Sequence, residues 1–139
     1  MNMKNKFHSV LLIDDSIPIN YFHKIMVEKS DVALSCIAVN NGQEALDYLQ
    51  NKQDAQERFP EVIFVDINMP VMNGWEFLDK FRTNHNSTLK EVVTVMLTTS
   101  INPDDKERAE KLNVSNYLLK PLTVKVLDDL RNTYFKGQL

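Results

Sequence analysis

The sequence predicts an α/β domain in which helices cover both faces of a doubly wound parallel sheet. Five short apolar runs, rich in β-branched residues, alternate with five helical patterns along the 139 residues. Parallel strands require crossover connections, and right-handed helical crossovers place helices on both sides of the sheet. Charged or hydroxyl residues follow four of the runs, and open α/β sheets bind ligands at the carboxyl ends of their strands.

Composition and charge limit the class of protein. With 43% hydrophobic and 25% charged residues, the chain suits one globular domain over 1–139, with its core between about 7 and 134. A net charge of -3 gives no electrostatic reason to expect direct nucleic-acid binding. The first apolar run, Val10–Ile13, is too short for a signal peptide or a membrane span. We therefore expect a cytoplasmic protein without membrane insertion.

The first strand and helix form one βα unit. Val10–Ile13 is a short β-rich run that stops at Asp14-Asp15, and Ser16 can cap the helix that follows. The apolar stripe of this helix, the face that normally packs against a core, consists of Ile17, Tyr21, Phe22, Ile25 and Met26.

The second unit and the central strand follow the same pattern. Ala33–Val39 has the composition of a strand, and Ala45, Leu46 and Leu49 mark the buried face of the next helix. The polar segment Gln50–Pro60 is expected to be a solvated connection, with a helix extension or a partner-specific loop as alternatives. Val62–Val65 then predicts a strand buried on both faces. It ends abruptly at Asp66.

The third helix is predicted where Phe77, Leu78 and Phe81 recur at helical spacing, after breaks at Met69-Pro70 and Asn73-Gly74. A polar loop over Asn84–Thr88 leads to the fourth strand, Val92–Leu97, which is followed by Thr98.

The fourth helix, Pro103–Leu112, begins at a capping Asn102 and has only Ala109 and Leu112 as clear apolar contacts. Because an amphipathic face provides most helical stability in proteins, we predict that this helix is the most mobile of the five. Val114–Leu119 predicts the fifth strand. The last helix, with Thr123 as its cap, has an apolar stripe of Val126, Leu127, Leu130 and Tyr134.

Five polar residues meet at the carboxyl edge of this predicted sheet: Asp14, Asp15, Asp66, Thr98 and Lys120. Each alone would be read as a cap, a loop anchor or a solvated charge. Together, three carboxylates need a cation, and Mg²⁺ takes oxygen ligands, typically one or two carboxylates with a phosphate. Magnesium, a lysine and a hydroxyl suit phosphoryl transfer, with Asp66 as the nucleophile that forms an acyl phosphate.

Four separated motifs resemble those of the receiver domain of two-component response regulators, in the single-domain chemotaxis-regulator style. The motifs are Leu11–Ser16, Val65–Pro70 with Asn73-Gly74, Met96–Thr98 and Tyr117–Pro121. The resemblance covers about residues 7–134 and implies a flavodoxin-like sheet with strand order 2-1-3-4-5.

The resemblance implies a role for each acid at the edge. Asp66 would accept a phosphoryl group from a phosphohistidine of a sensor kinase or a histidine phosphotransfer protein. Asp15, Asp66 and the backbone carbonyl of Asn68 would bind Mg²⁺ directly, and Asp14 would act through water. The protein would then be a signalling phosphoacceptor rather than an enzyme, with self-catalysed phosphorylation and dephosphorylation only.

The resemblance also implies how the signal is read. Thr98 would hydrogen-bond the phosphoryl group, Lys120 would pair with it, and Tyr117 matches an aromatic switch that turns inward when the threonine moves. An ordinary half-buried strand tyrosine is the alternative for Tyr117. The fourth helix, fifth strand and last helix would form the surface for a downstream protein, in a monomer or a phosphorylation-dependent dimer.

Three other functions compete with this one. A small haloacid-dehalogenase-like, Mg²⁺-dependent aspartyl-phosphate phosphatase would need a second acid two residues after its nucleophile, where this chain has Asn68. A flavin binder would need a phosphate-binding loop in place of Asp14-Asp15. A receiver-like scaffold that works without phosphorylation is disfavoured by the complete set of acids, threonine and lysine.

Two features qualify the resemblance: Thr99, and the polar segment Gln50–Pro60, which lengthens the link to the central strand and would tune the choice of partner. Thr99 stands where the family usually has alanine or another small residue, so we expect slower phosphoryl exchange.

The histidines His8, His23 and His85 lack the spacing of a metal site, and we expect them in solvent or at the edge of the core.

Overall fold

The computed structural model describes residues 5–85 and 92–135, in which five strands alternate with five helices. In chain order the elements are β1 (Phe7–Ile13), α1 (Ile17–Ser30), β2 (Ala33–Val39), α2 (Gly42–Asp54), β3 (Val62–Asp66), α3 (Gly74–Asn84), β4 (Val93–Thr98), α4 (Pro103–Lys111), β5 (Asn116–Leu119) and α5 (Val124–Phe135).

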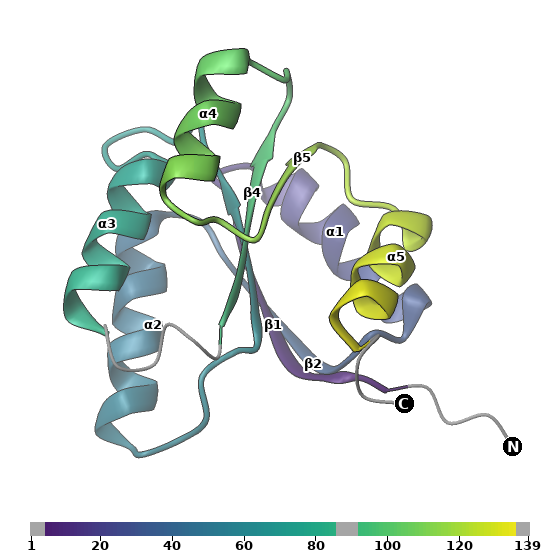
Figure 1. Ribbon diagram of the computed structural model, residues 1–139. Coiled ribbons are helices and arrows are strands. Elements are labelled where there is room, and N and C mark those ends of the chain that lie inside the picture. Colours follow the sequence, from purple (N-terminus) through teal and green to yellow (C-terminus); the bar gives the residue numbers. More distant parts are fainter. Residues whose placement is uncertain (1–4, 86–91, 136–139) are drawn as a thin grey trace, which may run out of the picture.

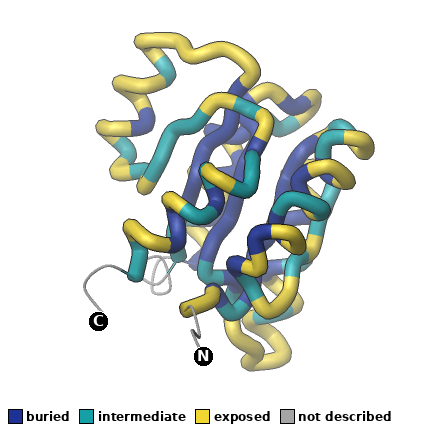
Figure 2. The backbone as a smooth tube through the Cα atoms, turned by 90° about the vertical axis from the view of Figure 1, so that its right-hand side faces the viewer, coloured by how far each residue is buried: buried dark blue, intermediate teal, exposed yellow. Residues whose placement is uncertain are grey.

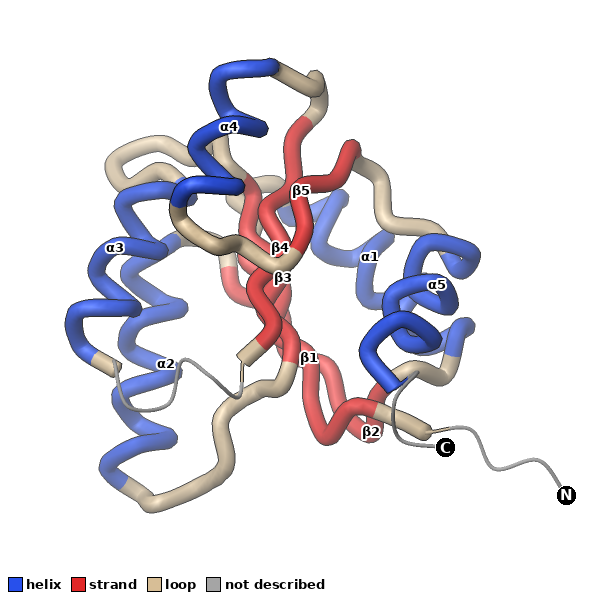
Figure 3. Tube along the Cα trace, viewed as in Figure 1, coloured by secondary structure: helices blue, strands red, loops and turns tan. Residues whose placement is uncertain are grey.

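The strands form one parallel sheet with the order β2-β1-β3-β4-β5. Helices α1 and α5 cover one face of the sheet, and α2, α3 and α4 cover the other (Figures 1 and 3). The predicted fold class and the strand order implied by the resemblance are both confirmed. Because all strands run in one direction, their carboxyl ends share one edge.

The sheet separates two apolar cores, and β3 contributes to both. Ile63 and Val65 pack in the core under α2, α3 and α4, whereas Val62 and Phe64 pack in the core under α1 and α5. All five residues of β3 are buried. The buried strands run through the centre of the molecule in Figure 2. The prediction of a central strand buried on both faces is therefore correct.

Side-chain caps begin the helices where the sequence predicts them. The Ser16 hydroxyl accepts a hydrogen bond from the backbone of Ile19 at 3.3 Å, and Thr123 accepts one from Val126 at 3.2 Å. Asn102 caps α4 through the backbone N–H of Asp104 at 2.8 Å. Such caps satisfy N–H groups that have no partner inside the helix.

The predicted packing face of α1 is wrong for its first turns, although Ile25 and Met26 are half-buried and Met26 packs against the core under α1 and α5. Ile17 and Tyr21 are each 70% exposed and Phe22 is 39% exposed, whereas the buried residues of α1 are Asn20, His23, Val27 and Ser30. Asn20 and His23 face inward because their side chains bond to other parts of the chain. The amide of Asn20, for example, donates to the carbonyl oxygens at the ends of two strands, Asp14 at 3.0 Å and Val39 at 2.9 Å. These tertiary hydrogen bonds override the apolar pattern.

Other boundaries differ slightly from prediction. Helix α2 continues to Asp54, so Gln50–Asp54 is a helix extension and only residues 55–58 form an exposed connection. Phe59 is half-buried against the core and Pro60 is buried. Asn84 ends α3, and residues 86–88 of the predicted polar loop lie outside the described residues. Strand β5 begins at Asn116 rather than at Val114. Within the described residues, no helix has both the length and the apolar character that a membrane span requires.

Candidate functional site

The predicted site residues lie at the carboxyl ends of four strands. Asp14 and Asp15 follow β1, Asp66 ends β3, Thr98 ends β4 and Lys120 follows β5. In the observed sheet order, β3 lies between β1 and β4. Asp66 therefore stands at the middle of the edge.

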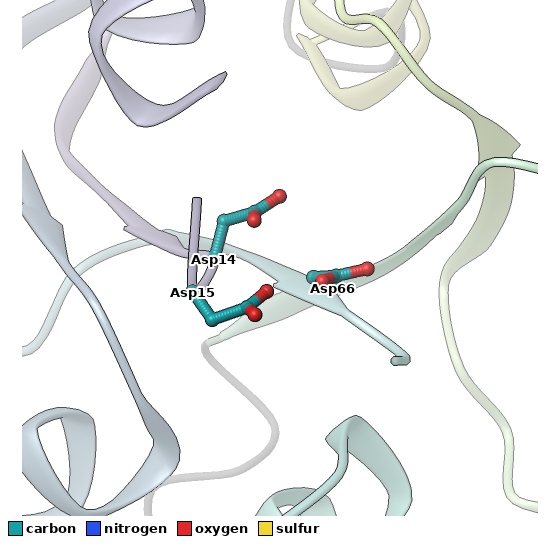
Figure 4. Close-up of side chains that lie close together, drawn as sticks. All are labelled: Asp14, Asp15 and Asp66. Atoms are coloured by element: carbon teal, nitrogen blue, oxygen red, sulfur yellow. The ribbon is translucent and has the colours of Figure 1, made fainter. Parts of the chain in front are cut away.

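Asp14, Asp15 and Asp66 form an acidic cluster. Each offers a carboxylate oxygen, and these three oxygens lie within 4.8 Å of one another. Figure 4 shows the side chains of Asp14 and Asp15 beside that of Asp66. Asp14 and Asp66 are only 2% and 3% exposed, whereas Asp15 is exposed. Carboxylates held this closely, with one open to solvent, are a donor set that fits a hard divalent cation.

Lys120 supplies positive charge to two of the three acids. Its Nζ atom lies 2.8 Å from Oδ2 of Asp14 and 3.3 Å from Oδ1 of Asp66, and its side chain is 10% exposed. Burial by itself lowers the pKa of Lys120, but the hydrogen bonds and charges of Asp14 and Asp66 outweigh that effect and raise it. Lys120 is therefore a fixed cation at neutral pH.

The acid-base state of Asp66 is shifted by its surroundings. Burial and the neighbouring charge of Asp14 raise the pKa of Asp66 from 3.8 to about 6, although Lys120 opposes this rise. The carboxyl group is thus mainly ionised at pH 7 but poorly solvated. An ionised, incompletely neutralised carboxylate is suited to act as a nucleophile or to bind a metal ion.

Backbone groups hold the acids in place. The Ser16 N–H donates to Oδ1 of Asp14 at 2.9 Å, and the Asn68 N–H lies 3.4 Å from Oδ1 of Asp66. Asn68 itself is exposed. These contacts fix the carboxylates, while the metal-ligand role of the Asn68 carbonyl stays a prediction.

Gly74 allows α3 to begin directly behind Asp66. Its N–H donates to the carbonyl of Ile67 at 2.9 Å. A Cβ atom at this position would lie only 2.7 Å from the Asp66 carbonyl oxygen and 2.9 Å from Cα of Ile67. Any side chain would therefore push the helix away from the site. The sequence marks Gly74 as a chain break but does not reveal this close approach.

Thr98 and Tyr117 are both engaged at the β4–α4 connection. The Thr98 hydroxyl donates to the carbonyl of Ser100 at 2.9 Å and accepts from the Ser100 N–H at 3.2 Å. The Tyr117 hydroxyl accepts from the N–H of Asn102, the cap of α4, at 3.1 Å. Tyr117 thus links β5 to the start of α4, and its role as a switch stays a prediction.

Two buried residues of α1 belong to the surroundings of the site but were not predicted there. Asn20 ties α1 to the ends of β1 and β2, and His23 accepts a hydrogen bond from Leu122, two residues after Lys120. The expectation that histidines lie in solvent or at the core edge is wrong for His23, which is 1% exposed. His85, 3% exposed, lies at the end of α3 against the half-buried Phe59, which agrees with the core-edge alternative. The only signal in the sequence is the three-residue spacing of Asn20 and His23, which places them on one helix face.

Comparison with known proteins agrees with this geometry. Residues 10–131 match the family described as the response regulator receiver domain. A two-component response regulator from Cytophaga hutchinsonii, known from a crystal structure, is 32% identical with a TM-score of 0.88, over 95% of this chain and 99% of that one. The chemotaxis protein CheY1 of Helicobacter pylori is 30% identical, over 86% of this chain and 90% of its own.

A third relative has been crystallised with a metal ion. The response regulator Rcp1 of Synechocystis sp. is 30% identical over 85% of this chain and 80% of its own. A crystal structure of Rcp1 in its Mn²⁺-bound form has a TM-score of 0.69 and 28% identity, over 95% of this chain and 94% of that one. The fold, the acidic cluster at the sheet edge and these similarities lead to one conclusion. The chain belongs to the response regulator receiver domain family.

Proposed function

We propose that the protein is the phosphoacceptor of a two-component phosphorelay, with Asp66 as the residue that receives the phosphoryl group. The observation that carries this proposal is the position of Asp66, which is 3% exposed, has its carboxylate within 4.8 Å of those of Asp14 and Asp15, and lies 3.3 Å from the ammonium group of Lys120. The donor would be a phosphohistidine of a sensor kinase or of a histidine phosphotransfer protein.

The transfer follows from the chemistry of these side chains. A carboxylate oxygen of Asp66 attacks phosphorus, the bond to the imidazole nitrogen of the donor breaks, and an acyl phosphate forms on Asp66. Lys120 pairs with a phosphoryl oxygen and so offsets charge that builds up during transfer. Hydrolysis of the acyl phosphate ends the signal, and we assign no catalytic turnover of a separate substrate.

The proposed metal is Mg²⁺, and the donor set of the site fits it because all its ligands are oxygen atoms. Asp15, Asp66 and the backbone carbonyl of Asn68 would hold the ion, and Asp14 would act through water. When bound, Mg²⁺ neutralises charge on the carboxylates and on the phosphoryl oxygens.

The signal would pass to the surface formed by α4, β5 and α5. Thr98 and Tyr117 are the proposed switch, since the Thr98 hydroxyl would exchange the Ser100 carbonyl for a phosphoryl oxygen and Tyr117 would leave Asn102 and turn inward. Helix α4 is suited to respond because Ala109 is its one buried residue, all of its residues being described. The partner that binds this surface would be a downstream protein or a second copy of the chain.

Phosphorylation by a small donor tests the proposal. Incubation with acetyl phosphate and Mg²⁺, followed by intact mass measurement, should add one phosphate to the wild-type protein and none to Asp66→Asn or to a sample with excess chelator. Asp79→Asn, an exposed acid on α3, is the matched control and should still be labelled. A wild type that gains no mass, or an Asp66→Asn variant labelled equally well, contradicts the proposal and favours a scaffold that works without phosphorylation.

A further inference from the structure

His23 is a buried histidine that connects α1 to the loop that carries Lys120. Its side chain is 1% exposed, and its Nε2 atom accepts a hydrogen bond from the backbone N–H of Leu122 at 3.0 Å. The two residues are 99 positions apart in the chain. This contact therefore spans α1 and the β5–α5 connection.

The contact requires a neutral imidazole, because only an unprotonated ring nitrogen can accept a hydrogen bond. Burial lowers the pKa of His23 to about 4; the charge of Asp14 opposes this shift and that of Lys120 adds to it. With Nε2 as the acceptor, the neutral ring carries its proton on Nδ1. At neutral pH the imidazole of His23 is therefore uncharged, and its Nε2 atom remains able to accept the hydrogen bond from Leu122.

The backbone from Lys120 to Leu122 is held at both ends. The Lys120 N–H donates to the carbonyl of Thr98 at 2.7 Å, which fixes one end against β4. Leu122 is fully buried in the core under α1 and α5, and its N–H is held by His23. Between these anchors, the side chain of Lys120 reaches back to Asp14 and Asp66.

We infer that His23 is a positioning residue for phosphoryl transfer, which holds the Lys120–Leu122 loop against α1 and thereby keeps the Lys120 ammonium group beside Asp66. The inference rests on the proposed function of Asp66. Its mechanism is indirect, since His23 acts through Lys120. A histidine that only stabilised the core would weaken the fold without changing the position of that ammonium group.

Chemical labelling of Lys120 tests this placement without any phosphorylation. Acetylation by an N-hydroxysuccinimide ester, followed by peptide mass mapping, should modify Lys120 slowly relative to Lys125, whose side chain is 84% exposed. The leucine in His23→Leu fills the space of the imidazole but cannot accept the hydrogen bond from Leu122, so Lys120 should be acetylated severalfold faster. In His23→Gln, the side-chain carbonyl oxygen can replace Nε2 as acceptor, and Lys120 should again be acetylated slowly.

The rate of labelling by acetyl phosphate with Mg²⁺ gives the second measurement. His23→Leu should slow phosphorylation of Asp66 about tenfold, the lower end of the range found when groups that orient metal ligands are removed. In a Lys120→Met background, His23→Leu should cause almost no additional loss, because residues that act through one another are not additive. Val27→Ala, at another buried position of α1, is the control for lost packing and should leave Lys120 labelling unchanged.

The outcomes separate the two proposals. Equal slowing by His23→Leu with and without Lys120, or unchanged acetylation of Lys120 in a folded His23→Leu protein, would overturn the positioning role. A wild type that accepts no phosphate would refute the function of Asp66, while the acetylation result would still decide whether His23 positions Lys120. If His23→Leu fails to fold, His23→Gln and His23→Asn replace it, since their carbonyl oxygens differ in reach and only the former should keep Lys120 protected.

Discussion

Lys120 is bound more closely to Asp14, at 2.8 Å, than to Asp66, at 3.3 Å. The ammonium group thus contacts both acids, and its contact with Asp66, the acid that we propose as phosphoacceptor, is the longer one. Two buried carboxylates with one lysine leave negative charge that is not neutralised. Burial is the larger cause of the raised pKa of Asp66, and this charge imbalance adds to it, so the pKa stays above its ordinary value despite a neighbouring cation.

Replacing Asp66 by asparagine should stabilise the protein at neutral pH. The folded-state pKa of about 6 lies above the ordinary 3.8, so between about pH 4 and 6 the folded state keeps a proton that the unfolded state has lost. Stability from this group is present at low pH and is lost as pH rises through 6. We expect Asp66→Asn to raise the free energy of unfolding by about 2 kcal/mol at pH 7.5 and by little at pH 4. Urea unfolding of the wild type and of Asp66→Asn at pH 7.5 and pH 4 measures this difference in the free energy of unfolding. Equal stabilisation at the two pH values would disprove the charge explanation.

Magnesium should stabilise the folded protein, and Asp15 should be needed for the effect. An ion present at ten times its dissociation constant adds about 1.4 kcal/mol to the free energy of unfolding. Asp15 is exposed, so Asp15→Asn should leave the metal-free protein equally stable but abolish most of the gain. Thermal unfolding with and without Mg²⁺ measures this, with Asp79→Asn as control. A gain that survives in Asp15→Asn would exclude Asp15 as a direct ligand.

Thr99→Ala should accelerate phosphoryl exchange. Thr99 is exposed and directly follows Thr98 at the carboxyl end of β4, where a small residue would widen access to Asp66. We expect both phosphorylation by acetyl phosphate and loss of the label to become severalfold faster. Time courses of intact mass measure both rates, and Thr133→Ala, an exposed threonine on α5, is the control. Unchanged rates would show that Thr99 does not limit access.

Helix α4 should exchange its backbone amide protons faster than α2 and α3. Ala109 is its buried residue, whereas α3 buries five residues, including Trp75 and Phe77. The guanidinium group of Arg108 lies 4.9 Å from the centre of the Trp75 ring, a cation–π contact that helps to hold α4. Arg108→Ala should therefore destabilise α4 by about 0.5–1 kcal/mol. Hydrogen exchange measured by mass spectrometry tests both statements, with Lys111→Ala as control, and slow exchange in α4 would contradict the predicted mobility.

The sequence was sufficient for the residues that end strands. Asp14, Asp66 and Lys120 follow apolar runs, and in a parallel sheet the ends of such runs meet at one edge whatever the details of packing. The order of the strands is a different matter, because short apolar runs do not encode their neighbours in the sheet. Only the resemblance to a known family predicted that order.

The sequence was not sufficient for α1. An apolar stripe such as Ile17 and Tyr21 predicts the buried face only when apolar packing is the one interaction that decides how the helix is oriented. Here Asn20 and His23 face inward because each satisfies backbone groups of distant segments. The partner of His23 lies 99 positions away, and no local pattern carries that information.

The distance along the chain between the members of the acidic site has a consequence for how the protein is made. Asp14 and Lys120 are separated by 106 positions, so the ammonium group reaches the acids only after β5 has joined the sheet. A chain still emerging from the ribosome, or one shortened by proteolysis before Lys120, contains the carboxylates without their counter-charge. Under the proposed function, the full rate of phosphoryl uptake would therefore be reached only after β5 has joined the sheet, and incomplete chains would take up phosphate more slowly than finished ones.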